Sequence, residues 1–443
     1  MTDELNSKAA ELISLLEKSK ERRNKKSSAI DENLKGTSLI MDLGEVQDFK
    51  TFNTDGYGNK VSAFASLKEG YIGLTPTNYV RLQELVIQAL ENKQINQKAD
   101  YEFIETEIFN WLILCYQEKR IKRDLVTYLE DRIDENCKEY IFYFKVLALA
   151  IEEAFDIGDV EISHLSEDKI QNELESLKEI KDDTEELDSF FNEFKEPVLA
   201  RTLSYGVETK AKKTAMLQAE LSINGLKCFF TNESLTQSFQ IFDVDFNFNT
   251  NDFSSFIYET TEKKFSFQSS FNRTQGGHPI IIKKDKLVEI KKGGLSRFSN
   301  FINKPKNGSL YEEIIHGINH LGRVTSTRNL HHRVVELISF FERFIVPKDN
   351  SKAYGQKRLK DNLLPKIPYI QDDIEDYRKY VNTFYRIRDK YLHNKIELPI
   401  NLHDLFYFQR LGTLVLIYCM ELNKQLNEFD DLLEHFGIKG ANK

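Results

Sequence analysis

The sequence predicts an α+β protein that is predominantly α: a helical N-terminal region (residues 1–200), a central antiparallel β-sheet region (201–300) and a C-terminal helical bundle (301–443). Three observations lead to this prediction. A length of 443 residues exceeds what one hydrophobic core usually organises, so two or three domains are expected. Apolar residues recur at helical spacing in the first and last thirds, but they alternate with polar residues in between. Only 8 Pro and 20 Gly, with 12% aromatic residues, are typical of a globular chain.

The N-terminal region is expected to consist mainly of helices. Five apolar residues lie on one stripe of a helix predicted over residues 3–26. The dipeptide Asp55-Gly56 separates two short apolar runs and predicts a hairpin or a loop. Further helices are expected over residues 75–90, 106–120 and 138–155, followed by a strongly charged connecting helix over residues 166–195.

The central region has the two-residue period of a half-exposed strand. In the stretch FDVDFNFN, residues 242–249, apolar and polar residues alternate strictly. We therefore expect an antiparallel sheet over roughly residues 205–295, closed by the break at Gly293-Gly294. Alternation places Asp243 and Asp245 on the outward face without a third ligand, so we interpret them as solvent-facing and not as a metal site.

Charge is distributed unevenly along the chain. The formal net charge is −9, which argues against a protein that coats nucleic acid, but the residues from Arg297 onward carry 23 Lys and Arg against 18 Asp and Glu. A basic C-terminal third could bind phosphate, although solvated helix faces produce the same counts. Four widely spaced cysteines form no metal-binding pattern, and we found no apolar run long enough to cross a bilayer, so the sequence predicts a soluble cytoplasmic protein.

The C-terminal third is expected to contain helices over residues 310–322, 328–346, 354–364, 371–392 and 402–427. The fourth of these helices carries the most informative stretch, YRIRDKYLHNKIELPIN, residues 385–401. Arg388 falls at the edge of its apolar stripe, where an arginine needs an anionic partner. His393 follows five residues later, about 140° away around a continuous helix. The two side chains could border one cleft if the helix ends at His393 with Asn394 as a left-handed cap, and Asp389 could orient either cation.

The spacing of Arg, four residues and His resembles the RxxxxH motif of the HEPN (higher eukaryotes and prokaryotes nucleotide-binding) superfamily of ribonucleases. The resemblance extends to HHRVVELISFFERFIVP, GQKRLKDNLLPKI and the apolar helix LHDLFYFQRLGTLVLIYCMELN, so that residues 310–430 look like an HEPN-like bundle of the Apea-like branch. Such domains occur in bacterial anti-phage proteins. The resemblance covers only the C-terminal third and says nothing about residues 1–295.

The resemblance implies a metal-independent endoribonuclease without cofactors that acts as a homodimer through its C-terminal domain. It implies an RNA substrate, such as tRNA or mRNA of host or phage, and a role as a toxin or in antiviral defence by abortive infection, with a phage trigger or a regulatory protein as possible partner and no membrane. The implied catalytic residues are Arg388 and His393, supported by Asp389 and Asn394. Candidate substrate-binding residues are Lys357, Arg358, Lys360 and Lys395.

Three alternatives remain open. The HEPN-like bundle could be a non-catalytic RNA- or nucleotide-binding scaffold that only dimerises. Arg388 could be a structural ion-pair residue, with Glu336 or Glu342 as its partner. His316 and His320, one helical turn apart, could bind zinc, although no acidic residue or cysteine lies at a supporting spacing.

Overall fold

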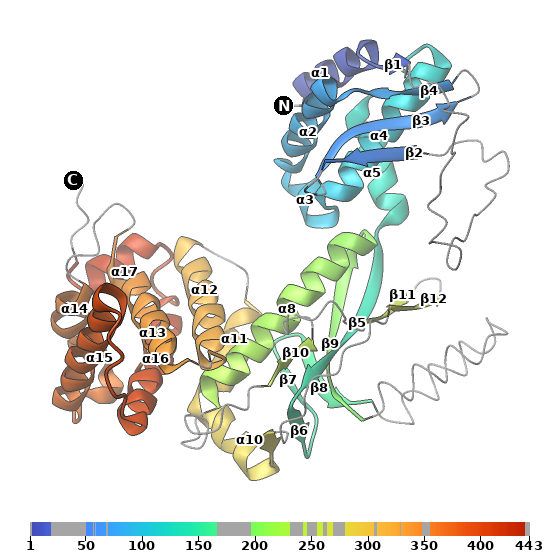
Figure 1. Cartoon of the computed structure of the whole chain (residues 1–443). Helices are drawn as coiled ribbons and strands as arrows, with labels where there is room; N and C mark the ends of the chain where they lie inside the picture. Colours follow the sequence, from blue (N-terminus) through green and yellow to red (C-terminus); the bar gives the residue numbers. More distant parts are fainter. Residues whose placement is uncertain are drawn as a thin grey trace, which may run out of the picture. The chain divides into compact units, whose positions relative to one another are not determined.

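A computed structural model of the chain describes residues 2–18, 50–55, 57, 59–67, 70–165, 196–230, 242–245, 255–259, 264–268, 280–304, 308–327, 329–347 and 355–438. The chain divides into two compact units (Figure 1). Unit 1 comprises Met1–Glu139 and Tyr205–Lys213, and unit 2 comprises Tyr140–Ser204 and Thr214–Lys443. Helices predominate and are accompanied by antiparallel sheets, which confirms the predicted α+β, mainly α class.

Unit 1 packs helices against a small antiparallel sheet with the strand order β1-β4-β3-β2 (Figure 1). The hairpin of β2 and β3 turns at Asp55, whose carboxylate accepts hydrogen bonds from the backbone N–H groups of Tyr57 and Asn59 at 2.8 and 2.9 Å. The elements of this unit are α1 (Thr2–Ser14), β1 (Glu17–Lys18), β2 (Lys50–Thr54), β3 (Lys60–Leu67), β4 (Gly70–Leu74), α2 (Pro76–Leu90), α3 (Lys93–Lys98), α4 (Tyr101–Glu118) and α5 (Leu125–Asn136).

The second chain segment of unit 1 completes its core. Val207 is 2% exposed within the apolar cluster of this unit, and its backbone N–H donates to the carbonyl of Lys98 at 2.8 Å. The buried carboxylate of Asp100 caps α4 by accepting from the N–H of Phe103, and it also accepts hydrogen bonds from the side chains of Thr209 and Lys213. Residues 205–213 are therefore an integral part of unit 1.

Unit 2 begins with a seven-stranded sheet, in which β5 and β9 are central and β12, β11, β8 and β7 lie further out. The pairs β7–β8, β8–β9, β5–β10, β5–β11 and β11–β12 are antiparallel, and β13 pairs in parallel with β6 in a separate sheet. The strands are β5 (Lys138–Leu147), β6 (Leu149–Ile151), β7 (Phe155–Ile157), β8 (Val160–His164), β9 (Val198–Gly206), β10 (Asp243–Val244), β11 (Ser255–Glu259), β12 (Lys264–Gln268) and β13 (Ile280–Ile282).

The helices of unit 2 form its larger part (Figure 1). In the C-terminal bundle, α12, α13, α15 and α16 pack against one another. Four of the five helices predicted in this third of the chain are confirmed, with ends shifted by up to five residues. The remaining one, expected over residues 354–364, is a four-residue α-helix followed by a π-helical turn. The helix α8 (Glu208–Phe229) begins in unit 1 and enters unit 2 at Thr214. The other elements are α10 (Lys284–Ile290), the π-helical turn η3 (Lys291–Leu295), α11 (Ser296–Ile302), α12 (Gly308–Thr325), α13 (Leu330–Ile345), α14 (Gly355–Arg358), η5 (Leu359–Leu363), η6 (Leu364–Lys366), η7 (Pro368–Ile370), α15 (Ile374–Asn394), α16 (Leu402–Leu422) and α17 (Phe429–His435).

The two compact units do not follow the predicted domain borders at residues 200 and 300. The sheet begins at β5, where a helix over residues 138–155 was expected, and the expected sheet region contains the 22-residue helix α8. The segment Tyr140–Phe144 is buried throughout, so it lacks the polar alternation that identifies a strand, and a short apolar run does not distinguish strand from helix. In α8, by contrast, Ala211, Ala215 and Ala219 are fully buried at helical spacing.

The solvent-facing interpretation of Asp243 is also wrong. Its side chain is buried and forms an ion pair with Lys227, which is 5% exposed and also donates hydrogen bonds to Asn224 and Ser326. Burial lowers the pKa of Lys227, although the charge of Asp243 opposes this effect. Phe242 and Val244 are buried as well, so β10 is covered on both faces. The alternation of apolar and polar residues along this strand therefore does not indicate which side chains face solvent.

Several predictions fall on residues outside the described ranges, namely the helix over residues 166–195 and the strand residues 246–249. The first helix, expected over residues 3–26, ends at Ser14 and is followed by β1. Among the described residues one helix, α16, is long and apolar enough by composition to cross a membrane, contrary to the expectation that no segment qualifies. More than half of its apolar window is buried, because α16 packs against α12, α13 and α15 inside the bundle.

Candidate functional site

The motif residues lie at the C-terminal end of α15. This helix buries Tyr377, Val381 and Phe384 against the bundle and continues through Asn394. It was expected to end at His393, with Asn394 as the left-handed cap, but the left-handed residue is Lys395, with φ of 55°. The backbone N–H groups of Lys395 and Ile396 donate to the carbonyls of Tyr391 and Lys390 at 3.2 and 3.1 Å, which closes the helix one residue later than predicted.

Arg388 is held by two carboxylates. Its Nη1 lies 2.9 Å from Oε1 of Glu342 on α13, and its Nε and Nη2 lie 3.0 and 2.9 Å from Oδ1 of Asp389. The guanidinium also lies over the ring of Tyr385, 4.5 Å from the ring centroid. Burial opposes the charge of the guanidinium, but the hydrogen bonds to Asp389 and the charge of Glu342 outweigh this effect and raise the pKa of Arg388. The predicted partners Glu342 and Asp389 are therefore confirmed.

Glu336, the other predicted partner of Arg388, contacts a different residue. Its Oε2 lies 3.0 Å from Nε2 of His320. His320 is one of the two imidazoles considered for zinc, and its partner is thus a single carboxylate. The described residues contain no cluster of three or more His, Cys, Asp or Glu side chains that could hold a metal ion, so the geometry of His316 and His320 supplies no argument for a metal centre.

His393 is exposed and does not meet Arg388 within one chain. Because α15 is continuous through both residues, an offset of five positions places the two side chains about 140° apart around its axis. Among the described residues His393 makes no hydrogen bond or ion pair, and the same is true of the side chain of Asn394, which is also exposed. The structure therefore brings Arg388, Asp389 and Glu342 together, and it leaves His393 and Asn394 facing solvent.

Aromatic contacts fix the backbone beyond the end of α15. The ring of His331 on α13 stacks on Tyr391 with a centroid distance of 5.1 Å, and its Nε2 lies 2.9 Å from the carbonyl oxygen of Leu398. His332 contacts the same tyrosine edge-to-face at 5.5 Å. No role was predicted for Tyr391, His331 or His332 from the sequence. The sequence signal for Tyr391 is an aromatic residue two positions before His393, on the helix that carries the motif.

The candidate substrate-binding cations lie at different degrees of exposure. Lys357 and Lys395 are exposed, whereas Arg358 and Lys360 are half-buried, and Arg358 lies 3.5 Å from the carbonyl oxygen of Ile345. The helix α14, which carries Lys357 and Arg358, begins beside the Arg388 cluster: a Cβ at Gly355 would come within 2.6 Å of Oε1 of Glu342. Two of the four cations thus belong to an element that contacts the cluster directly.

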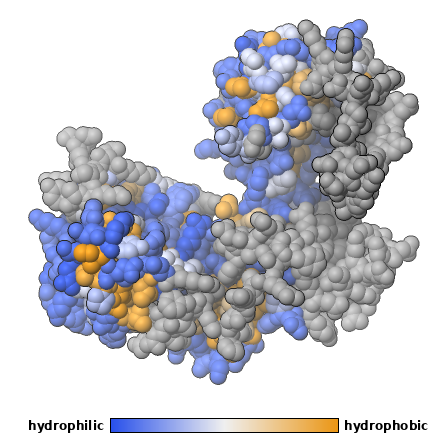
Figure 2. All heavy atoms as spheres, in the orientation of Figure 1, coloured by the Kyte–Doolittle hydropathy of each residue, from blue (hydrophilic) through white to orange (hydrophobic). Residues whose placement is uncertain are grey.

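Apolar side chains are exposed on both sides of His393 in the sequence. Leu392 is 42% exposed and Ile396 is 46% exposed. Figure 2 shows apolar side chains gathered within the otherwise hydrophilic visible face of the C-terminal bundle. These two side chains are available to a second molecule, although single exposed apolar residues are common on protein surfaces.

The arrangement at the end of α15 is therefore a buried acid that holds a charged arginine, an exposed histidine about 140° away and two exposed apolar side chains. In comparisons with known proteins, no family model, no curated protein and no solved structure matches this chain.

Proposed function

We propose that the chain is a metal-independent endoribonuclease of the HEPN type that acts as a homodimer. The observation that carries this proposal is the placement of the motif: Arg388 is fixed and charged through Glu342, and His393 is exposed at the end of the same helix. A guanidinium binds phosphate and an imidazole transfers protons near neutral pH, which are the two requirements for cleaving RNA through its own 2′-hydroxyl.

The chemistry follows from the substrate. His393 accepts the proton of a ribose 2′-hydroxyl, and the 2′-oxygen attacks the adjacent phosphorus. Arg388 stabilises the negative charge that develops on the phosphoryl oxygens. The bond between phosphorus and the 5′-oxygen then breaks, and a protonated imidazole supplies the proton to the leaving oxygen. The products are a 2′,3′-cyclic phosphate and a 5′-hydroxyl, and DNA is excluded because it lacks the attacking group.

A second copy of the chain supports this chemistry in two ways. It can place a second motif opposite the first, so that one cleft contains an arginine and a histidine that a single α15 directs apart. It can also cover the exposed side chains of Leu392 and Ile396. The exposed Lys357 and Lys395 then lie on elements that border the motif and are available to RNA phosphates.

We further propose that the protein is cytoplasmic and serves in anti-phage defence or as a growth-arresting toxin, and that unit 1 and the sheet of unit 2 respond to the trigger. This part of the proposal rests on the sequence resemblance of residues 310–430. It predicts that the nuclease is restrained in uninfected cells, because unrestrained cleavage of host RNA would arrest growth.

The test is to incubate the purified full-length protein with total RNA in the presence of EDTA. We expect fragments with 2′,3′-cyclic phosphate ends, and we expect Arg388→Ala and His393→Ala each to abolish them. Arg386→Ala is the matched control, because Arg386 is an exposed arginine two residues before Arg388 on the same helix. RNA that stays intact even with protein taken from infected, growth-arrested cells would refute the proposal, as would full activity of both motif variants.

A non-catalytic scaffold is the second candidate, and one observation favours it. The donors of Arg388 already meet two carboxylates within its own chain, as in a structural ion pair. Three of its five N–H donors are used, so binding phosphate along the edge of Nε and Nη2 requires Asp389, whose side chain is 52% exposed, to release the guanidinium. The scaffold predicts that Arg388→Ala and His393→Ala bind RNA and dimerise like the wild type and that none of the three proteins cuts RNA.

A further inference from the structure

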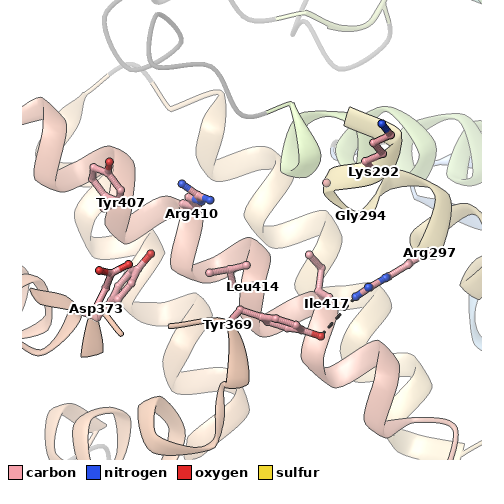
Figure 3. Close-up of a pocket in the computed structure, with 11 residues that line it drawn as sticks. Lys292, Gly294, Arg297, Tyr369, Asp373, Tyr407, Arg410, Leu414 and Ile417 are labelled. Atoms are coloured by element: carbon pink, nitrogen blue, oxygen red, sulfur yellow. Dashed lines mark hydrogen bonds between the residues drawn. The ribbon is translucent and has the colours of Figure 1, made fainter. Parts of the chain in front are cut away.

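A pocket of about 250 Å³ lies in unit 2 where three segments meet. Its walls come from the π-helical turn η3 with the start of α11, from the segment of η7 and the start of α15, and from the middle of α16. Figure 3 shows Lys292 and Arg297 on one side, Tyr369 along another and Arg410 on α16. Because α15 rises about 1.5 Å per residue, its first turn, beside this pocket, lies roughly 20 Å from Arg388. The pocket is thus separate from the RxxxxH motif.

Positive charge dominates the lining of the pocket. Lys292, Arg297 and Arg410 face one acidic residue, Asp373. Arg297 is already paired, since its Nη1 lies 2.5 Å from Oε1 of Glu421. Arg410 and Lys292, however, form no hydrogen bond or ion pair with any residue that the structure describes. Both side chains are exposed, and Arg410 on α16 retains its donors for an anion at the recess.

Aromatic rings complete the lining. Tyr369 is 41% exposed, and its hydroxyl donates to Glu421. Burial and that hydrogen bond raise the pKa of Tyr369 to about 12, so its ring is a neutral phenol at neutral pH. Tyr407 is half-buried and lies parallel to Tyr380 at 6.0 Å, which holds its ring in place. Ring faces beside unpaired cations suit a ligand that is planar at one end and anionic at the other.

An interrupted helix forms one wall of this recess. The helix that would join α10 to α11 is interrupted by η3, in which Gly294 has φ of 136°, a conformation that other residues rarely adopt. A Cβ at Gly294 would also come within 2.6 Å of the ring of Phe229. At Gly293, which lines the pocket, a Cβ would meet no atom within 4 Å. Interruptions of this kind within helices are frequent at functional sites.

We propose that this pocket binds a free mononucleotide, with its phosphate at Arg410 and its base against a tyrosine ring. The recess is large enough to hold part of a small ligand such as a mononucleotide, because 250 Å³ lies just below the usual range of ligand pockets. The phosphate contacts are charge-assisted and carry most of the affinity, while the rings distinguish a nucleotide from a simple anion. The site goes beyond the proposed ribonuclease activity and does not depend on it.

The test is isothermal titration calorimetry of the full-length protein with AMP, adenosine, inorganic phosphate and a short RNA that ends in a 3′-phosphate. We expect saturable binding of AMP, and binding of adenosine and phosphate weaker by about tenfold or more. Arg410→Ala should weaken AMP binding by about tenfold or more, and Arg410→Lys should restore part of it. Lys283→Ala, an exposed lysine at the start of α10 outside the pocket, is the matched control and should bind AMP like the wild type.

Four results would overturn the inference. The first three are the absence of saturable AMP binding, equal affinity for phosphate and AMP, and unchanged AMP binding by Arg410→Ala. The fourth is RNA that binds as tightly as AMP, because the pocket would then bind the end of an RNA chain and not a free mononucleotide. The titration is repeated with His393→Ala, in which AMP binding should persist. If His393→Ala loses ribonuclease activity but still binds AMP, the ribonuclease proposal and the mononucleotide proposal are tested independently of each other.

Discussion

Removal of the Arg388 guanidinium should lower the free energy of unfolding of the bundle, independently of any effect on RNA cleavage. Glu342 is 7% exposed, and without Arg388 its only remaining hydrogen-bond partner among the described side chains is the hydroxyl of Tyr385 at 3.3 Å. Leaving a buried carboxylate without its cation costs about 3–5 kcal/mol. The Arg388 side chain is 22% exposed, so water reaches the site and lowers the cost. We therefore expect Arg388→Ala to lose about 2–3 kcal/mol of unfolding free energy.

A double variant separates this structural effect from catalysis. In Arg388→Ala/Glu342→Gln the carboxylate becomes a neutral amide, so about half or more of the lost stability should return. Arg386→Ala, the exposed neighbour, should stay within about 0.5 kcal/mol of the wild type. If the double variant is nearly as stable as the wild type and still cuts no RNA, the loss of activity is chemical.

The assay must distinguish the two units. The sequence contains one tryptophan, Trp111, which is 3% exposed inside unit 1, so its fluorescence reports unfolding of unit 1. Hydrogen exchange in α13 and α15 reports the bundle. Arg388→Ala should speed exchange in these two helices and leave the tryptophan transition unchanged. The reasoning is refuted if Arg388→Ala costs no more than Arg386→Ala, because the ion pair would then contribute nothing to the fold.

Two further predictions concern a carboxylate and a glycine. Burial of Asp100 opposes its charge, but the hydrogen bonds to its carboxylate outweigh burial and lower its pKa in the folded protein. The ionised carboxylate therefore stabilises unit 1 at pH values above its unfolded pKa of about 4. This stabilisation is lost as the pH falls through the folded pKa. In acid titrations followed by Trp111 fluorescence, Asp100→Asn should thus be less stable at neutral pH and should lose less stability below pH 4 than the wild type; parallel curves would contradict this. Gly294→Ala should lower the melting temperature of unit 2 markedly, because alanine rarely adopts a φ of 136° and its Cβ would clash with the ring of Phe229. Gly293→Ala is the control, because its Cβ meets open space and should leave the melting temperature unchanged. Equal melting temperatures of the two variants would contradict this prediction.

The sequence predicted the helical bundle well because each of its helices has a polar and an apolar face. The apolar positions of α12, α13 and α15 repeat at helical spacing, and the structure buries them. The sheet was misplaced because its central strand β5 is apolar on both faces, so it carries no alternation. Asp243 was misjudged for the same reason, since its buried partner Lys227 lies 16 residues earlier in the sequence, on α8. Patterns along the chain do not reveal pairings between distant segments.

The candidate site was predictable in part. The Arg388–Glu342 pair followed from the rule that an arginine at the edge of a core needs an anion. The end of α15 was predicted to within one residue, but the helix is continuous through both motif residues, which keeps Arg388 and His393 about 140° apart. The pocket at Arg410 left no sequence signal, because its lining comes from three segments spread over more than 100 residues.

The two-segment composition of unit 1 has a consequence for synthesis on the ribosome. Val207 and Lys213 complete contacts with Lys98 and Asp100, so the first 139 residues alone lack part of their native core. During translation the N-terminal segment of unit 1 remains without its second segment while more than 60 further residues are added to the chain. A fragment that stops at residue 139 should therefore aggregate or bind chaperones, and supplying residues 205–213 as a separate peptide should rescue its solubility.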